Sequence, residues 1–322
     1  IVNSLKAISW PGNIICLKKR DNKKSLVEEI TGIEVWPLNL ESPGELFSII
    51  NSKIPIEDTK FLFFTSEEYH GYLHLILELC QNCHFYPKNF SKIDLILDRY
   101  LFYKFIEDKQ IAKVPLTISS EKDPWDYFDQ PFLLRIRKSW QKGVRRKGVY
   151  YIDSRNIFIQ VIELLLAEGI SRDEWCYQQV LSQQAKHNLS VCGWHELGGN
   201  HYFATRKIKQ HPGKMGNGDL VERVSPPDKL FEITEKLLNN LNFSGPFELE
   251  FILDPEDGVY KIIELNPRFW MQHGLIEKIT DNELVKRYLH MDYSSVVEEE
   301  RSRYWVNAFY AIFRIMKLEF DM

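Results

Sequence analysis

Two segments decide the fold of this chain: GPFELEF at residues 245–251 and YKIIELNPRFW at residues 260–270. Apolar and polar residues alternate in both, which predicts two β-strands, and DPEDG between them predicts the turn of a hairpin. Side chains of a strand alternate between its faces, so Glu248 and Glu250 share one face and the apolar residues beside them share the other. The hairpin therefore has an apolar core face and an acidic face.

The length of the turn determines which residues meet the acidic face. A five-residue loop over residues 255–259 sets Glu250 directly across from Glu264, with Asn266 two residues farther along. In this register, one face of the return strand carries Tyr260, Ile262, Glu264 and Asn266.

Two carboxylates that face each other repel, and a hard cation between them removes the repulsion. Carboxylate and amide oxygens are the ligands that Mg²⁺ accepts, so we predict a metal site made by Glu250, Glu264 and Asn266. The alternative is a solvated hairpin whose acidic face meets water. Arg268 favours the metal site, because a nearby guanidinium can grip a phosphoryl or carboxylate group with two hydrogen bonds.

The hairpin and its E-x-N-x-R motif at residues 264–268 resemble the metal-binding hairpin of the ATP-grasp superfamily. HPGKMGNGDL at residues 211–220 resembles a loop in a branch of uncharacterised members of this superfamily that are presumed to join carboxylates to amines. The resemblance extends from about residue 91 to 275. It implies an α/β protein with the ATP-grasp fold, in which two α+β lobes grip ATP, preceded by a small Rossmann-like α/β domain. It also implies that Glu250, Glu264 and Asn266 hold Mg²⁺, with Mn²⁺ as an alternative, and that Arg268 is catalytic.

Other positions match nucleotide-binding residues of the family, with substitutions. Arg99 and Arg135 stand where the family has phosphate-binding lysines, and arginine keeps the charge while presenting a broader fork. YQQVL resembles the hinge that contacts adenine, with Gln179 in place of the usual glutamate, and Asn188 replaces a ribose-binding acid. The resemblance thus implies an ATP site made by Arg99, Arg135, Gln179, Val180, Leu181 and Asn188.

The loop SWQKGVRRKGV at residues 139–149 lies where the family has a glycine-rich lid over the phosphates. It has few glycines, and thus few free backbone N–H groups for a phosphate cradle, so side-chain charge would take over part of that task. The alternative is a solvated basic turn. The four cations of the loop are Lys142, Arg145, Arg146 and Lys147.

The chain is expected to divide into a preceding α/β domain at residues 1–92, an N-terminal lobe at 93–178 and a C-terminal lobe at 179–322. The first domain should contain strands at 14–17, 33–38 and 60–65, and its first strand lacks a following G-x-G-x-x-G, so a dinucleotide site there has no support.

Six helices are expected from capping residues and from apolar residues at helical spacing. Ser154 should cap a helix that runs to about residue 168, and another helix should cover about residues 228–241. Ser42 and Ser66 should begin two helices of the first domain, and a single helix should cover residues 91–110. An amphipathic helix over residues 298–320 should pack on the core or form a homodimer contact.

The charge and the cysteines limit the class of protein. The 322 residues include 41 Lys and Arg against 45 Asp and Glu, so the net charge is 41 − 45 = −4, which does not favour nucleic acid as a partner. No apolar run reaches the ~20 residues that cross a membrane, and no secretory signal is evident. Five scattered cysteines suit a reducing environment, so a cytoplasmic location is expected. Cys80, Cys83 and His84 match a haem attachment motif, and the cysteine pair fits half a zinc site, but a helix end followed by a strand is the favoured interpretation.

These observations favour an ATP- and Mg²⁺-dependent ligase that joins a small-molecule carboxylate to an amine through an acyl phosphate. The alternatives are a degenerate ATP-binding protein, which the two arginines and the glycine-poor loop favour, and a small-molecule kinase. The motifs do not name the acid or the amine, because substrate pockets depend on shape and a few polar contacts.

Overall fold

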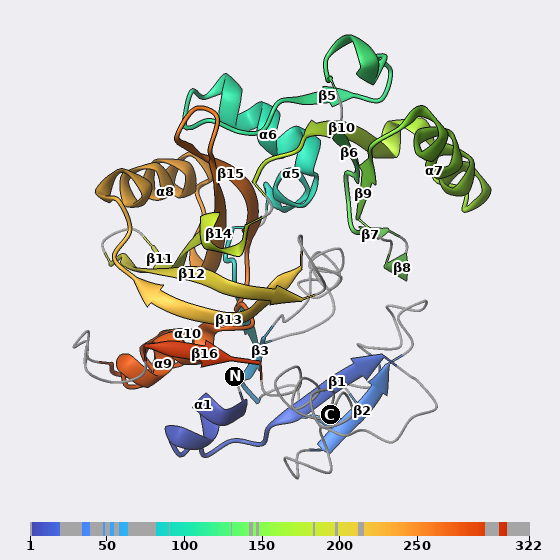
Figure 1. Ribbon diagram of the computed structural model, residues 1–322. Coiled ribbons are helices and arrows are strands. Elements are labelled where there is room, and N and C mark those ends of the chain that lie inside the picture. The colour runs from blue at the N-terminus through green and yellow to red at the C-terminus, as the bar shows by residue number, and fades with distance from the viewer. Residues whose placement is uncertain are drawn as a thin grey trace, which may run out of the picture.

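The computed structural model shows a small N-terminal part, a four-stranded lobe and a six-stranded lobe (Figure 1). It describes residues 2–19, 34–38, 48, 52–54, 58–63, 82–89, 91–129, 131–141, 144–145, 148–182, 184–196, 199–211, 216–293 and 303–307.

The N-terminal part begins with helix α1 (Val2–Ala7) and contains two pairs of parallel strands. β1 (Ile15–Lys19) pairs with β2 (Glu34–Leu38), and β3 (Lys60–Leu62) pairs with β4 (Cys83–Phe85). Parallel pairing requires crossover connections, as an α/β layer has. The three strands expected in this part are therefore confirmed.

Two expectations for this part have other outcomes. The helices expected to begin at Ser42 and Ser66 lie outside the described residues. Cys83 begins a strand as expected, but it is disulfide-bonded, contrary to the expectation of reduced thiols. A disulfide sulfur neither ligates zinc nor attaches haem, so those two alternatives do not apply at Cys83. No helix among the described residues has the length and apolar character needed to cross a membrane.

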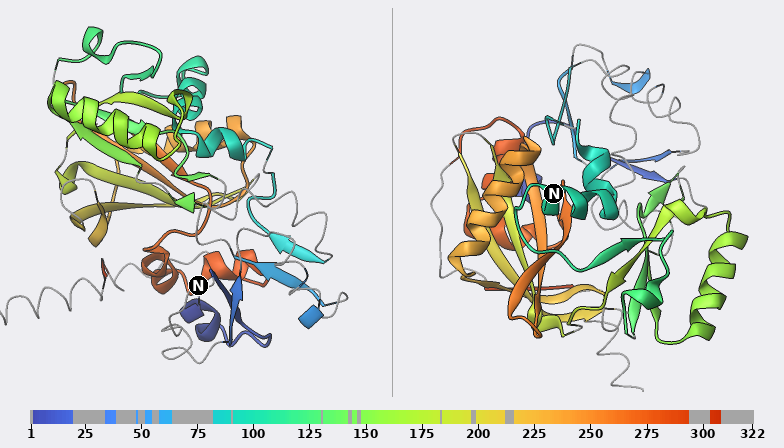
Figure 2. Two further views of the ribbon diagram at one scale, coloured as in Figure 1. Left: turned by 90° about the vertical axis from the view of Figure 1, so that its right-hand side faces the viewer. Right: turned by 90° about the horizontal axis from the view of Figure 1, so that it is seen from above.

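The N-terminal lobe is an antiparallel sheet in the order β5-β10-β6-β9, and helix α7 (Arg155–Ala167) lies against it (Figure 2). Ser154 caps α7 as the sequence predicted, because its Oγ accepts the N–H of Ile157 at 3.3 Å. The strands are β5 (Thr117–Ser119), β6 (Phe132–Ile136), β9 (Val149–Ile152) and β10 (Trp175–Gln179).

The single helix expected over residues 91–110 is in fact two helices, α5 (Ile93–Leu97) and α6 (Arg99–Asp108). Asp98 separates them, because its backbone is extended and its carboxylate accepts the N–H groups of Tyr100 and Leu101, both at 3.1 Å. An N-cap of this kind starts a new helix and ends the previous one. The break places Arg99 at the first position of α6.

The C-terminal lobe is an antiparallel sheet in the order β15-β14-β11-β12-β13-β16, with helix α8 (Asp228–Leu241) packed on it. Helices α9 (His273–Ile279) and α10 (Glu283–Tyr288) follow the sheet's hairpin. The strands are β11 (Asn188–His195), β12 (His201–His211), β13 (Asn217–Val224), β14 (Gly245–Asp254), β15 (Val259–Asn266) and β16 (Tyr304–Val306).

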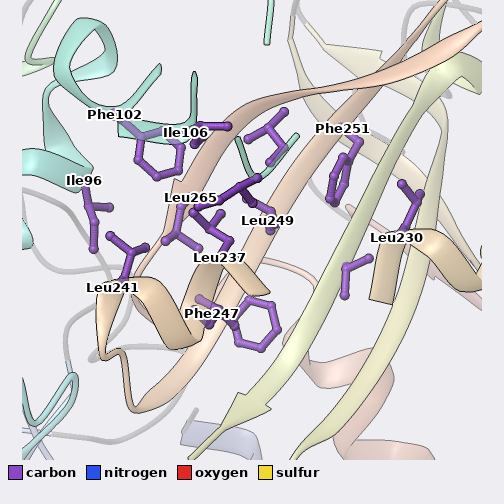
Figure 3. Packing of buried hydrophobic residues seen from close by; sticks show 14 of the residues in the cluster. Ile96, Phe102, Ile106, Leu230, Leu237, Leu241, Phe247, Leu249, Phe251 and Leu265 are labelled. Atoms are coloured by element: carbon purple, nitrogen blue, oxygen red, sulfur yellow. The ribbon is translucent and has the colours of Figure 1, made fainter. Parts of the chain in front are cut away.

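The core of this lobe lies between the sheet and two helices, α6 and α8 (Figure 3). Phe247, Leu249 and Phe251 of β14 are completely buried there, against Phe102 of α6 and Leu237 of α8. Burying side chains of this size stabilises the fold by roughly 1.5–3 kcal/mol each. Because alternate residues of β14 fill the core, the glutamates between them point to the other face of the sheet.

The turn of the hairpin is one residue shorter than predicted. Asp254 pairs with Val259, so only residues 255–258 form the turn. The pairing continues in this register as far as Phe251, which lies opposite Ile262.

A β-bulge at Ile263 then shifts the register by one residue. Beyond the bulge, Glu250 pairs with Glu264, as the sequence predicted, although by a different route. The bulge also reverses the alternation of faces, so the prediction that Tyr260 and Ile262 share a face with Glu264 is wrong. Ile262 is fully buried in the core and Tyr260 packs against it.

The expectation of a helix over residues 298–320 is wrong for the part of this segment that the structure describes. Tyr304–Val306 is strand β16, and Trp305 pairs with Val221 of β13. Aromatic and β-branched residues suit a strand, and the edge of β13 offers unpaired backbone groups that a strand satisfies. The remaining residues of that segment, 298–302 and 308–320, lie outside the described residues.

We expect Glu277→Gln to stabilise the protein in mildly alkaline solution. Burial raises the pKa of Glu277 from 4.5 to about 8. The folded state therefore keeps a proton that the unfolded chain loses, so this carboxyl lowers the free energy of unfolding as the pH rises between these values. Glutamine removes the ionisable group and keeps the acceptor for the N–H of Val285, which lies 2.9 Å from Glu277 Oε1.

Thermal unfolding of Glu277→Gln and wild type at about pH 5 and about pH 8 measures this effect. The variant should melt at a higher temperature only at the higher pH. The same difference at both pH values would contradict the assignment to this carboxyl.

Candidate active site

A cleft lies where β6 and β9 of the N-terminal lobe face the sheet of the C-terminal lobe. It brings together most of the residues that the sequence predicted for nucleotide and metal binding. Its lining includes Arg135, Val180, Leu181, Asn188, Lys207, Glu250 and Glu264.

The polar residues on the acidic face of the hairpin form two cross-strand pairs. Glu250 on β14 lies opposite Glu264 on β15. Glu248 lies opposite Asn266, whose Nδ2 donates a hydrogen bond to Glu248 Oε2 at 3.1 Å. The three predicted metal ligands are therefore brought together. Glu248, which the sequence placed on the same face but not among the metal ligands, joins them as a buried carboxylate.

Each of the two facing carboxylates has its own cation. Arg99 donates from Nη2 to Glu264 Oε1 at 2.5 Å, and its Nη1 donates to Ser139 Oγ at 2.9 Å. Lys207 on β12 donates from Nζ to Glu250 Oε2 at 2.8 Å. These ion pairs offset the repulsion between Glu250 and Glu264 across the hairpin.

Sequence reasoning missed Lys207, and the sheet explains why. Lys207 and Glu250 belong to strands that are not neighbours, because β11 lies between β12 and β14. In β11, Ser190 pairs with Glu250 on one side and with Thr205 on the other, so a small residue lies beneath the contact. The segment TRKIKQ at residues 205–210 contains three cations, and only the register selects the one that reaches the carboxylate.

Two further arginines have buried N–H groups that lack a protein acceptor among the described residues. Arg135 is 7% exposed and donates from Nη1 to Gln178 Oε1 at 3.0 Å, but its Nε has no partner. Arg268 donates to Asn266 Oδ1 at 3.2 Å, and its Nε also has no partner. A buried donor without an acceptor is costly, so both groups are suited to an anionic ligand.

The charges around the carboxylates shift their pKa values in opposite directions. Burial alone would raise the pKa of Glu264, but Arg99 and then Arg135 outweigh it and lower that pKa, so Glu264 is ionised. Burial and the neighbouring Glu250 raise the pKa of Glu248 to about 7. The hairpin thus carries a firmly ionised carboxylate beside one that titrates near neutrality.

Two of the three predicted hinge residues line the cleft, and the third does not. Val180 and Leu181 line the cleft. Gln179, at the end of β10, instead donates from Nε2 to Asp254 Oδ2 at 3.4 Å and accepts from Lys261 Nζ at 3.4 Å. Its side chain therefore ties the N-terminal lobe to the tip of the hairpin.

Asn188 lies next to the carboxylates of the hairpin. The basic loop is described in part. Asn188 Nδ2 lies 3.5 Å from Glu250 Oε2. In the loop, β7 (Trp140–Gln141) and β8 (Val144–Arg145) form a short hairpin. Lys142, Arg146 and Lys147 lie outside the described residues.

The donor set fits a magnesium ion whose coordination is completed by the oxygens of a bound phosphate group. Within the described part of the chain, no three His, Cys, Asp or Glu side chains form a complete metal site by themselves. Two facing carboxylates and one amide oxygen form an incomplete set, and Mg²⁺ is usually held by one or two carboxylates together with substrate phosphates. Glu250, Glu264 and Asn266 would therefore need phosphate oxygens to complete the coordination.

Replacing Lys207 by methionine should destabilise the protein, because it leaves Glu250 without its cation. We expect a loss of about 2–3 kcal/mol at neutral pH, below the range for fully buried pairs because both side chains remain slightly exposed.

Chemical denaturation at neutral pH measures the loss. The double variant Lys207→Met/Glu250→Gln should recover most of the stability, and Lys209→Met, at an exposed position of β12, is the matched control. Equal losses in the single and double variants would show that Lys207 acts through packing.

Comparison with known proteins finds a family match for one part of the chain. Residues 226–299, which contain α8, the acidic hairpin and Arg268, match the family described as the ATP-binding domain of the carbamoyl-phosphate synthase L chain. A search of curated proteins found no significant match.

Solved structures resemble most of the chain at low sequence identity. The biotin carboxylase domain of Hydrogenobacter thermophilus 2-oxoglutarate carboxylase, in complex with MgADP, ADP and bicarbonate, has a TM-score of 0.67 and 14% identity over 94% of this chain and 70% of its own. N5-carboxyaminoimidazole synthetase from Staphylococcus aureus, complexed with ADP, has a TM-score of 0.67 and 16% identity over 92% and 76%. Rhizobium etli pyruvate carboxylase has a TM-score of 0.66 and 14% identity over 90% of this chain, which spans only 27% of that enzyme.

Proposed function

Because this chain has the ATP-grasp fold, as its hairpin predicted, we propose that it is an ATP- and Mg²⁺-dependent ligase that joins a carboxylate to an amine through an acyl phosphate. The observation that carries the proposal is the opposition of Glu250 and Glu264 among four convergent cations. A nucleotide-binding protein without chemistry has no need for two facing carboxylates beside donors that lack acceptors.

The cleft has the groups that phosphoryl transfer requires. Mg²⁺ held by Glu250, Glu264 and Asn266 would neutralise charge on the phosphates and orient them. Arg135 would donate its buried Nε–H to a phosphate oxygen, and Arg268 would stabilise the charge that spreads over the transferred phosphoryl group. Val180 and Leu181 provide an apolar wall for the adenine.

The proposed reaction has two steps. An oxygen of the acid attacks the γ-phosphorus and ADP leaves, which gives an acyl phosphate. The nitrogen of the amine then attacks the acyl carbon and inorganic phosphate leaves, with a proton lost from nitrogen. Positioning and charge neutralisation suffice for this chemistry, so no Ser-His-Asp set is required. The adenine nucleotides and the bicarbonate in the similar structures support this class of substrates.

Trapping with hydroxylamine tests the proposal without knowledge of the natural amine. An acyl phosphate is electrophilic, so a ligase should form a hydroxamate when ATP, Mg²⁺ and the correct acid are present. We would screen pools of amino acids, short peptides and sugar acids and measure hydroxamate together with ADP. Glu264→Gln should reduce both by at least about a hundredfold, whereas Glu256→Gln, on the exposed turn of the same hairpin, should retain them.

The two products also separate the competing functions. ADP that depends on the acid but appears without hydroxamate would indicate a kinase that phosphorylates a hydroxyl group. Nucleotide binding with neither product would indicate a binding protein and would contradict the ligase.

Arg135→Ala should weaken ATP binding by about 1.5–3 kcal/mol, the range for a hydrogen bond to a charged group, and Arg135→Lys should lose less. Isothermal titration with a non-hydrolysable ATP analogue measures both. Arg155→Ala, in the N-terminal lobe on the exposed start of α7, serves as the control. An unchanged affinity in Arg135→Ala would place the phosphate site elsewhere.

A further inference from the structure

The geometry points to a coupling between metal and nucleotide. We propose that Arg99 and Lys207 are resident counter-ions that keep a free divalent cation out of the hairpin and admit it only together with the nucleotide. This inference rests on the proposed function and concerns how the same site is filled.

The first observation is that both facing carboxylates already hold a cation through an oxygen. Arg99 reaches Glu264 Oε1 at 2.5 Å from α6, and Lys207 reaches Glu250 Oε2 at 2.8 Å from β12. The side chains of Arg99 and Lys207 are only 11% and 12% exposed. In such a setting, water screens charges less than it does on an open surface, so the two contacts compete effectively with an incoming ion.

The second observation is the balance of charge around the hairpin. Counted over the described residues, four cations act on three carboxylates, so even with every carboxylate ionised the cluster is positive by one charge, 4 − 3 = +1. A free divalent cation would add to this excess. A complex of that cation with a nucleoside triphosphate is negative, so the same excess attracts it. The charged groups are Arg99, Arg135, Lys207 and Arg268 with Glu248, Glu250 and Glu264.

The third observation is that the cations fall into two classes. Arg135 and Arg268 each have a buried Nε–H without an acceptor among the described residues. Each can therefore donate this N–H to a phosphate without breaking an existing hydrogen bond. Arg99 and Lys207 are held by the carboxylates. The first class would provide the initial affinity for the triphosphate.

The second class would then exchange partners. Phosphate oxygens offer Arg99 and Lys207 new acceptors, so both can leave Glu264 and Glu250 without becoming unpaired. The freed carboxylate oxygens become available to the cation that arrives with the triphosphate. Metal and nucleotide therefore assist each other's binding, and this mutual effect is a coupling free energy between the two ligands.

The test measures binding of Mn²⁺, which electron paramagnetic resonance detects directly, with and without a non-hydrolysable ATP analogue. Wild type should bind Mn²⁺ weakly alone and much more tightly with the analogue. Arg99→Gln should bind Mn²⁺ alone about 10- to 100-fold more tightly, the factor expected for removal of a charged hydrogen bond that competes with the ion. The same variant should bind the analogue more weakly, so the two affinities move in opposite directions.

Lys207→Gln provides a second, independent variant with the same expected pattern. Lys104→Gln is the matched control, because Lys104 is an exposed cation of α6 whose partner is Glu107, outside the cleft. A general loss of structure would weaken both ligands together, so opposite changes cannot come from misfolding. Circular dichroism of each variant confirms that the fold is retained.

The outcomes distinguish this inference from the proposed function. Analogue binding by wild type, combined with an unchanged or weaker affinity for Mn²⁺ alone in both Arg99→Gln and Lys207→Gln, would overturn the counter-ion exchange and leave the ligase proposal standing. Tight binding of Mn²⁺ alone by wild type would also overturn it. A wild-type protein that binds no nucleotide at all would contradict the proposed function itself.

Discussion

The repulsion between Glu250 and Glu264 is the constraint on which the rest of the cleft depends. Two partly buried carboxylates on neighbouring strands require compensation from their surroundings. The compensation comes from elements far apart in the chain, since Arg99 begins α6 and Lys207 lies on β12. The ion pair of Arg99 therefore connects α6 to the sheet that bears the acidic hairpin, and the ion pair of Lys207 connects two strands of that sheet.

The local structure of several elements follows from this requirement. The extra residue Ile263 places Glu264 opposite Glu250 and keeps Ile262 in the core. Asp98 ends α5 and caps α6, which puts Arg99 at a helix start where its guanidinium can reach the hairpin. Both features interrupt a regular element, and both orient a charged group of the cleft.

The two lobes contribute different chemistry to the cleft. The four-stranded lobe supplies Arg135 and the apolar residues Val180 and Leu181, which suit phosphate and adenine. The six-stranded lobe supplies the carboxylates, Lys207 and Arg268, which suit a metal ion and a transferred phosphoryl group. Gln179 bridges the lobes through Asp254 and Lys261, so the segment that carries Val180 and Leu181 and the acidic hairpin share a hydrogen-bonded connection.

The sequence by itself determined the hairpin, its acidic face with Glu248 and Glu250, and the ATP-grasp fold. These features could be predicted because alternation along a strand and a dense local motif depend on residues close together in the chain. Only the tertiary structure identified Lys207 as a member of the charged cluster, revealed the bulge at Ile263 that sets Glu264 opposite Glu250, and showed that residues 304–306 form a strand. Each of these depends on the register of strands that are distant in sequence, and local periodicity carries no information about which distant strand lies alongside.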